Sequence, residues 1–278
     1  MNKIKLMLTA LLIALSGAAA GICGDRPAAV LPILMYHHIV ADDAVGDAVI
    51  SVGRFEEQLR YLFDSGWETV SFDEVIAFAD GRGDLPDKPV CIVFDDGYES
   101  NYSLAFPLLE KYGMKATICV IGSAVGCSGE DMLPHFGWDE AREMVSSGLI
   151  SIQNHTYDMH MSAPSGSVFR PDALPLASES ESDYAAALGN DYRRCAGLIR
   201  RELGYEPVVF AYPHGRYNEL SERILRTLGA RVTLTTEPGV NLIIAGDRDT
   251  LYTLKRYNIN DGTEMDSLVD YLAGDFHD

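Results

Sequence analysis

Two adjacent carboxylates, Asp95 and Asp96, follow a short apolar run and precede a glycine. The run at 89–94 is uncharged and rich in β-branched residues, which predicts a buried strand. Gly97 permits a sharp exit from that strand, so both carboxylates would lie at its C-terminal end. Burying such a pair is costly unless a metal cation or a catalytic role compensates for the lost hydration. An ordinary turn is the alternative interpretation, because Asp-Gly is also a hairpin signal.

His155 and His160 are the second group with chemical potential. On a helix this spacing would turn the two imidazoles to different faces, because neighbours on one face are three or four positions apart. At the end of a strand followed by a turn they can converge. Two neutral imidazoles and one carboxylate leave positions open on a divalent metal. We therefore predict Asp96, His155 and His160 as metal ligands and Asp95 as the base; two unrelated surface histidines are the alternative.

The segments that must position these residues alternate between strand and helix patterns with short connections. This alternation predicts βα units and a parallel sheet, and seven or eight such units favour a barrel over an open sheet. Predicted strands are 30–36, 67–70, 89–94, 115–121, 149–154, 207–212, 231–235 and 254–259. Predicted helices are 54–65, 72–79, 102–112, 138–147, 183–203, 218–228 and 265–273.

Polar residues gather at the predicted C-terminal ends of four strands, which is where the functional groups of such barrels lie. Polar residues without a shared function would also occur at the starts of strands and on helix faces. We therefore expect one site built from His37-His38, Asp95-Asp96, His155 with His160, and Tyr212-Pro213-His214-Gly215.

Composition restricts the partners of the chain. The 278 residues include 22 basic and 41 acidic side chains, which give a net charge of −19. This charge argues against electrostatic binding of nucleic acid or of an anionic membrane surface. The sequence indicates no oligomeric state.

The first residues have the pattern of a secretory signal peptide. Lys3 and Lys5 precede the apolar run 6–15, and small residues follow at 16–21. We predict a signal peptide at 1–21, export to the cell envelope or medium, and no stable membrane span after cleavage; a retained membrane anchor is the alternative. Lipid anchoring at Cys23 ranks lower, because Ile22 stands where such a signal has a small residue.

One domain is predicted at 27–278, with a surface insertion at about 161–182 that is rich in serine, proline and acidic residues. No Cys-x-x-Cys pair is present, which argues against a structural zinc site of that type. Cys127 and Cys195 are candidates for a disulfide after export.

The motifs resemble those of the polysaccharide deacetylases, carbohydrate esterase family 4, which carry the NodB homology domain. Residues 93–97 (Val-Phe-Asp-Asp-Gly), with His155-Thr156 and His160, resemble the first two family motifs. Residues 211–215 (Ala-Tyr-Pro-His-Gly) resemble the third, and 34–39 (Leu-Met-Tyr-His-His-Ile) an N-terminal signature. The resemblance covers about 31–259. It implies a distorted (β/α)7 barrel, a divalent metal that is usually Zn²⁺, and removal of an acetyl group from a sugar.

Three departures from the family pattern are informative. Four residues separate the two histidines where many members have three, which is similar to the branch that deacetylates exported poly-N-acetylglucosamine. The third motif lacks its usual arginine, so another group must hold the base Asp95. No Leu-x-His motif occurs near the C-terminus to supply the general acid, and His277 in the tail is a poor substitute. The resemblance to the poly-N-acetylglucosamine branch implies His37, in its Tyr-His pair, as the candidate acid, and His214 is the alternative.

The expected function is metal-dependent deacetylation of an N-acetylglucosamine-containing polysaccharide, either an exopolysaccharide or peptidoglycan. A backbone N–H near Pro213 and His214 would help to stabilise the oxyanion. Tyr98 and Tyr212 would contact sugar rings or else pack in the protein. Two other functions are open: an acetyl-xylan-type esterase, and a catalytically silent carbohydrate-binding protein on the same fold.

Overall fold

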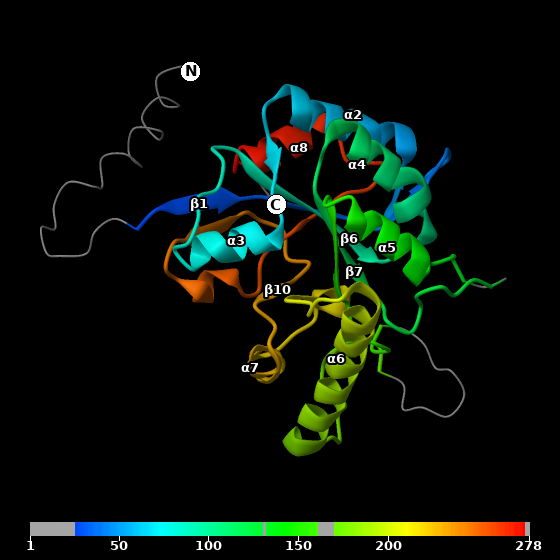
Figure 1. Cartoon of the computed structure of the whole chain (residues 1–278), viewed down its shortest axis with the longest axis vertical. Helices are drawn as coiled ribbons and strands as arrows, with labels where there is room; N and C mark the ends of the chain where they lie inside the picture. Colours follow the sequence, from blue (N-terminus) through cyan, green and yellow to red (C-terminus); the bar gives the residue numbers. More distant parts are fainter. Residues whose placement is uncertain (1–25, 130–131, 161–169, 276–278) are drawn as a thin grey trace, which may run out of the picture.

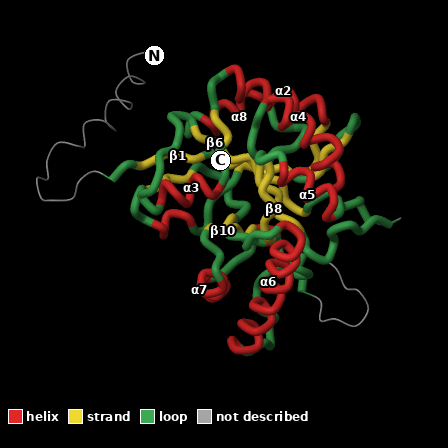
Figure 2. The backbone as a smooth tube through the Cα atoms, viewed as in Figure 1, coloured by secondary structure: helices red, strands yellow, loops and turns green. Residues whose placement is uncertain are grey.

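A curled parallel sheet lies at the centre of the molecule, with helices arranged around it (Figures 1 and 2). The computed structural model describes residues 26–129, 132–160 and 170–275. The strand order of the main sheet is β10-β9-β8-β7-β6-β2-β12, and β5 pairs with the beginning of β6. The strands are β1 (Ala28–Leu31), β2 (Ile33–Tyr36), β3 (His38–Val40), β4 (Val49–Ser51), β5 (Glu68–Thr69), β6 (Pro89–Asp96), β7 (Ala116–Val120), β8 (Ile150–Asn154), β9 (Val209–Ala211), β10 (Val232–Leu234), β11 (Asn241–Ile244) and β12 (Tyr257–Asn258).

The helices agree closely with the predicted segments. They are α2 (Val52–Asp64), α3 (Phe72–Ala79), α4 (Phe106–Tyr112), α5 (Trp138–Ser146), α6 (Glu181–Leu203), α7 (Glu219–Leu228) and α8 (Met265–Leu272), with short helical turns η1 (Asn101–Ala105), η2 (Pro213–Gly215) and η3 (Arg248–Leu251). α3 has a capping box at its N-terminus: the Ser71 N–H donates to Glu74 Oε2, and the Glu74 N–H donates to Ser71 Oγ. This reciprocal capping box fixes the first residue of the helix.

The segment 254–258 connects the two ends of the sheet. Leu254 forms a parallel bridge with Leu234 of β10, and β12 pairs with β2 at the opposite end. The predicted distorted (β/α)7 barrel is confirmed by this curled sheet and its surrounding helices.

β6 is buried along its whole length and separates two apolar clusters. Ile92 and Phe94 face the cluster beneath α2, α4 and α5, whereas Cys91 and Val93 face the cluster that includes α3 and the barrel interior. Side chains alternate between the faces of a strand. Asp95 therefore continues the interior face of the barrel.

Two prolines explain two of the differences between the predicted and the observed elements; β3 and β4 were also not predicted. The predicted strand 30–36 is divided at Pro32, which cannot donate a ladder hydrogen bond. β1 before it pairs antiparallel with β11, a strand that was not predicted. The predicted helix 102–112 begins as the π-helix η1, because Pro107 has no N–H for the regular bond and the preceding turn widens.

Cys127 and Cys195, the candidates for a disulfide, are both free thiols in the structure. Each sulfur instead lies near a backbone carbonyl, that of Ser123 for Cys127 and that of Val120 for Cys195. The predicted signal peptide, Cys23, His277 and the first part of the insertion at 161–169 lie outside the described residues. Within the described ranges, none of the helices combines the length and apolar character needed to cross a bilayer.

Candidate active site

A pocket of about 370 Å³ lies where the parallel strands end. It draws residues from all four segments in which polar groups were expected to meet, together with the loop before β4 and with β12. Its lining is Met35, His37, Asp47, Ala48, Asp95, Asp96, His155, His160, His214, Thr236 and Asn258. The structure thus brings the predicted metal ligands, the predicted base and both candidate acids to one cavity.

Asp96, His155 and His160 form a candidate metal centre. Asp96 Oδ1 lies 3.5 Å from His155 Nε2 and 3.4 Å from His160 Nε2, and the three candidate ligand atoms all lie within 4.8 Å of one another. Asp96 Oδ1 is buried and has no hydrogen-bond partner among the described residues. A buried carboxylate oxygen without a partner is costly, and a cation at this point would remove that cost. One oxygen and two imidazole nitrogens are a donor set that suits Zn²⁺.

The second nitrogen of His155 fixes its orientation. His155 Nδ1 lies 2.8 Å from the Ala211 carbonyl oxygen, to which it donates, and so Nε2 presents its lone pair to the pocket. Burial lowers the pKa of His155 to about 4, so the imidazole is neutral at pH 7. Neutral imidazole is the form that binds metal.

The backbone turns sharply at three of the strand ends. Asp96, Thr156 and His214 have φ values of 70°, 73° and 55°. The left-handed conformation costs a non-glycine residue about 1–2 kcal/mol. Thr156 is held in it on both sides, because its N–H donates to Asn154 Oδ1 and its carbonyl accepts from the Gly122 N–H. Such strain concentrates at functional sites, where the surrounding structure maintains it.

Arg256 holds the predicted base Asp95. Its Nη1 lies 2.8 Å from Asp95 Oδ1, its Nε donates to the Thr235 carbonyl, and the side chain is fully buried. Burial alone would raise the pKa of Asp95, but the adjacent guanidinium outweighs it and holds the pKa well below its ordinary value. Asp95 is therefore ionised at neutral pH.

Sequence reasoning missed Arg256, although it correctly required another group to hold Asp95. The available signal was an arginine inside the predicted strand 254–259. Period-two alternation places Arg256 on the face opposite Lys255. Arg256 is buried and Lys255 is exposed.

The two candidate acids occupy different surroundings in the pocket. The His37 carbonyl accepts a hydrogen bond from Asn101 Nδ2 at 2.7 Å, and His37 Nδ1 is buried without a partner among the described residues. His214 is exposed, its ring centroid is 4.6 Å from that of His160, and desolvation lowers its pKa.

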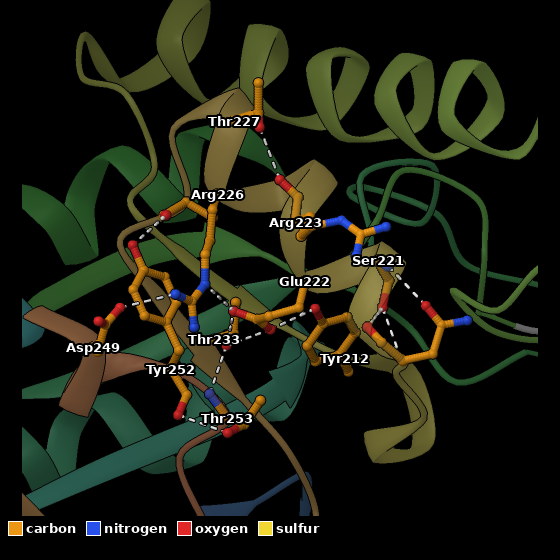
Figure 3. A network of polar contacts seen from close by, with 12 residues as sticks. Tyr212, Ser221, Glu222, Arg223, Arg226, Thr227, Thr233, Asp249, Tyr252 and Thr253 are labelled. Atoms are coloured by element: carbon orange, nitrogen blue, oxygen red, sulfur yellow. Dashed lines mark hydrogen bonds and ion pairs between the residues drawn. The ribbon is translucent and has the colours of Figure 1, made fainter. Parts of the chain in front are cut away.

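The two tyrosines predicted either to contact sugar or to pack in the protein do not line the pocket. The Tyr212 side chain is fully buried, and its hydroxyl donates to Glu222 Oε2 at 2.8 Å (Figure 3). Tyr98 is absent from the pocket lining; its ring lies against His38 and His135. Burial, followed by its interaction with the Asp96 carboxylate, raises the pKa of Tyr98. The structure therefore does not support stacking on a sugar for either ring. Pro213 is also buried.

Known proteins share both the sequence and the fold. A sequence profile of the family described as polysaccharide deacetylase matches residues 82–233. The Bacillus subtilis protein YxkH, assigned by name to the polysaccharide deacetylases, is 31% identical over 256 residues, covering 91% of this chain and 80% of that protein. Poly-beta-1,6-N-acetyl-D-glucosamine N-deacetylase of Escherichia coli K12 is 26% identical over 73% of this chain, which spans only 33% of the length of that enzyme.

Solved structures give the same result. IcaB from Ammonifex degensii superposes with a TM-score of 0.71 and 29% identity, covering 90% of this chain and 97% of that one. A de-N-acetylase from Aggregatibacter actinomycetemcomitans shares the fold, with a TM-score of 0.75 and 24% identity over 87% of this chain and all of that one. Three observations indicate the same family: the profile match, the similarity to YxkH, and the motif carboxylates Asp95 and Asp96 at the end of β6. The chain belongs to the polysaccharide deacetylase family, whose members are deacetylating hydrolases.

Proposed function

We propose that the protein removes acetyl groups from an N-acetylglucosamine-containing polysaccharide, with a divalent cation held by Asp96, His155 and His160. The observation that carries the proposal is the unpartnered, buried Asp96 Oδ1 beside two imidazole Nε2 atoms. Zn²⁺ is the cation that this donor set favours. When bound, such a cation lowers the pKa of a water and polarises a carbonyl.

Asp95 would act as the general base. Its Oδ1 is engaged by Arg256, whereas Oδ2 lies 3.9 Å from His155 Nε2, on the side of the candidate metal centre. The carboxylate is ionised because of the guanidinium, so it can accept a proton from a water that attacks the acetyl carbonyl. Arg256 does not contact that carbonyl and would act by orienting Asp95.

His37 would protonate the departing amine, with His214 as the alternative donor. Both histidines line the pocket that contains Asp95. The oxyanion would be stabilised by a backbone N–H of the β9 end. Pro213 has no N–H, and the Tyr212 N–H is bonded to the Leu234 carbonyl, which leaves the His214 N–H as the donor at this turn.

The relatives favour an N-acetyl over an O-acetyl substrate. The Escherichia coli enzyme and its Staphylococcus aureus counterparts, which are 26% identical to this chain, are named for poly-beta-1,6-N-acetyl-D-glucosamine. A silent carbohydrate-binding protein is the less favoured function, because Arg256 supplies the guanidinium that the third motif lacks. Export of the protein follows from the predicted signal peptide, and N-terminal sequencing of the extracellular or envelope form should begin near residue 21.

The test is acetate release from a panel of β-1,6- and β-1,4-linked N-acetylglucosamine oligomers, peptidoglycan and acetylated xylan. We expect release from a glucosamine-based substrate, loss after chelation and recovery with Zn²⁺. Acetate release from acetylated xylan alone would show that the protein is an esterase and would contradict the proposed amide hydrolysis. Tight oligomer binding without acetate release at any metal loading would indicate the silent binding protein.

A further inference from the structure

Asp191 on α6 reaches the loop that joins the two histidine ligands. Its Oδ1 accepts the Tyr157 N–H at 2.7 Å, and its Oδ2 accepts the Asp158 N–H at 2.8 Å. These are consecutive backbone donors between His155 and His160. Successive N–H groups that point to one side form a concave site for an anion. Here a side chain of the same molecule provides that anion.

α6 makes further contacts with the same segment. The Asn154 amide donates to the Tyr192 carbonyl at 3.2 Å, immediately before His155. The Arg194 guanidinium carbon lies 3.7 Å from the centroid of the Tyr157 ring. In addition, the Ser123 N–H donates to the Tyr157 carbonyl. The loop is thus held both by α6 and by the segment after β7.

The loop needs such support for a geometric reason. It turns through Thr156, whose φ of 73° is unfavourable for a β-branched residue. It must also bring two imidazoles separated by four residues to the same carboxylate oxygen. An isolated turn of this kind would sample several conformations, and each would change the distance between the two Nε2 atoms. A carboxylate that binds two adjacent N–H groups restricts the turn at its midpoint.

We propose that Asp191 is a positioning residue that sets the spacing of the two histidine ligands and thereby the affinity of the metal centre. This inference rests on the proposed function, since it assumes that His155 and His160 bind a cation. Asp191 contacts neither imidazole and acts through the backbone at Tyr157 and Asp158. Outer contacts of this kind commonly change metal affinity about 10- to 100-fold when removed.

The central experiment compares Asp191→Asn with the wild type in a chelator-competition titration with Zn²⁺. An amide keeps the size of the carboxylate, but it presents an NH₂ group to one of the two backbone donors. We expect the affinity to fall about 10-fold or more. The visible spectrum of the Co²⁺-loaded protein should change as well, because it reports the arrangement of the ligands. Glu181→Gln is the matched control, since it removes one exposed negative charge from α6 and should leave both readouts unchanged.

The outcomes separate the two proposals. If the wild type itself binds no Zn²⁺, the proposed function fails. If the wild type binds and Asp191→Asn, folded by circular dichroism, has the same affinity and the same Co²⁺ spectrum, the role of Asp191 is refuted. Hydrogen exchange provides a check that does not depend on the folding of a variant: the Tyr157 and Asp158 amides of the wild type should exchange slowly, and rapid exchange of both would also refute it.

Discussion

At the scale of single residues, the two adjacent aspartates lie in different environments. Asp95 is balanced by a buried arginine, whereas Asp96 has an oxygen with no partner among the described residues. The first arrangement suits a base that must stay ionised, and the second suits a metal ligand. The different roles proposed for two identical side chains thus follow from their different surroundings.

Replacing Asp95 tests this division. Asp95→Asn keeps the side-chain volume but cannot accept a proton, so we expect acetate release to fall by about 10²- to 10⁴-fold. Zn²⁺ content measured by metal analysis should stay at the wild-type level. In His155→Ala, by contrast, bound Zn²⁺ should be lost. Equal loss of metal in both variants would argue that Asp95 is itself a ligand.

Removing Arg256 should affect both stability and pH dependence. In Arg256→Met the buried carboxylate of Asp95 is left unpaired, which costs about 3–5 kcal/mol of the free energy of unfolding. Asp95 has a depressed pKa when folded, so its contribution to stability is present above its unfolded pKa and lost as the pH falls through the folded value. Without the guanidinium, burial raises that pKa. The acid limb of the kcat/KM profile should therefore move to higher pH.

Urea denaturation and a pH series of acetate release measure the two effects. Arg201→Met, which removes an exposed arginine paired with Glu202, is the control and should change the unfolding free energy by less than about 1 kcal/mol. An unchanged acid limb in a folded Arg256→Met variant would mean that the arginine does not control the ionisation of Asp95.

At the scale of elements, a buried polar network connects α7 to the β9 end of the site (Figure 3). Glu222 accepts hydrogen bonds from the Tyr212 hydroxyl and from Thr233 Oγ1, and its carboxylate pairs with Arg226. Tyr212 is two residues before His214, at the turn that borders the pocket. The network therefore fixes the position of this turn from outside the barrel.

Glu222→Gln should weaken the network without leaving a cavity. The amide can keep one acceptor, but it turns donors toward Tyr212 or Thr233, so we expect a loss of about 1–3 kcal/mol in the free energy of unfolding. Thermal denaturation of this variant beside Glu219→Gln, an exposed acid in the same helix, measures the difference. Equal melting temperatures for the two variants would contradict the assigned role of the network.

The elements themselves were largely predictable from the sequence. The uncharged, β-branched run at 89–94 and the helical spacing of apolar residues at 72–79 each predict the correct element without reference to the rest of the chain. Two wrong predictions have a local cause, because Pro32 and Pro107 interrupt the segments in which they lie. The missed strand β11 has a distant cause, because it is formed by pairing with β1. The strand-end residues were predictable because parallel strands bring their C-terminal ends to one edge.

At the scale of the whole molecule, the barrel was predicted, but the individual contacts that close it were not. Leu254 joins β10 and Tyr257 joins β2 through contacts between segments far apart in the sequence. That closure carries Arg256 to Asp95, across 161 positions. The family motifs therefore include the site carboxylates and histidines, but they do not include Arg256, which bonds to Asp95.

The charge of the molecule leads to a prediction about its substrate. The chain carries a net charge of −19, and the described lining of the pocket contains no lysine or arginine. Asp95 is balanced by Arg256, and a divalent cation would leave one positive charge beside Asp96. Asp47 has an exposed side-chain carboxylate on the pocket wall. Its backbone carbonyl accepts a hydrogen bond from Asn258 Nδ2 at 2.8 Å. A glycan with some free, protonated amines should therefore bind better than a fully acetylated one of the same length.

This preference should depend on salt, because exposed charges are screened over about 10 Å at 0.1 M ionic strength. We expect KM for partly deacetylated oligomers to rise several-fold between about 20 mM and about 300 mM salt, and KM for fully acetylated oligomers to change little. Asp47→Asn should remove most of the difference. Asp42→Asn, in the same exposed loop but outside the pocket lining, should retain it. If both variants behave alike, the preference arises from the overall charge of the protein, and Asp47 has no local part in it.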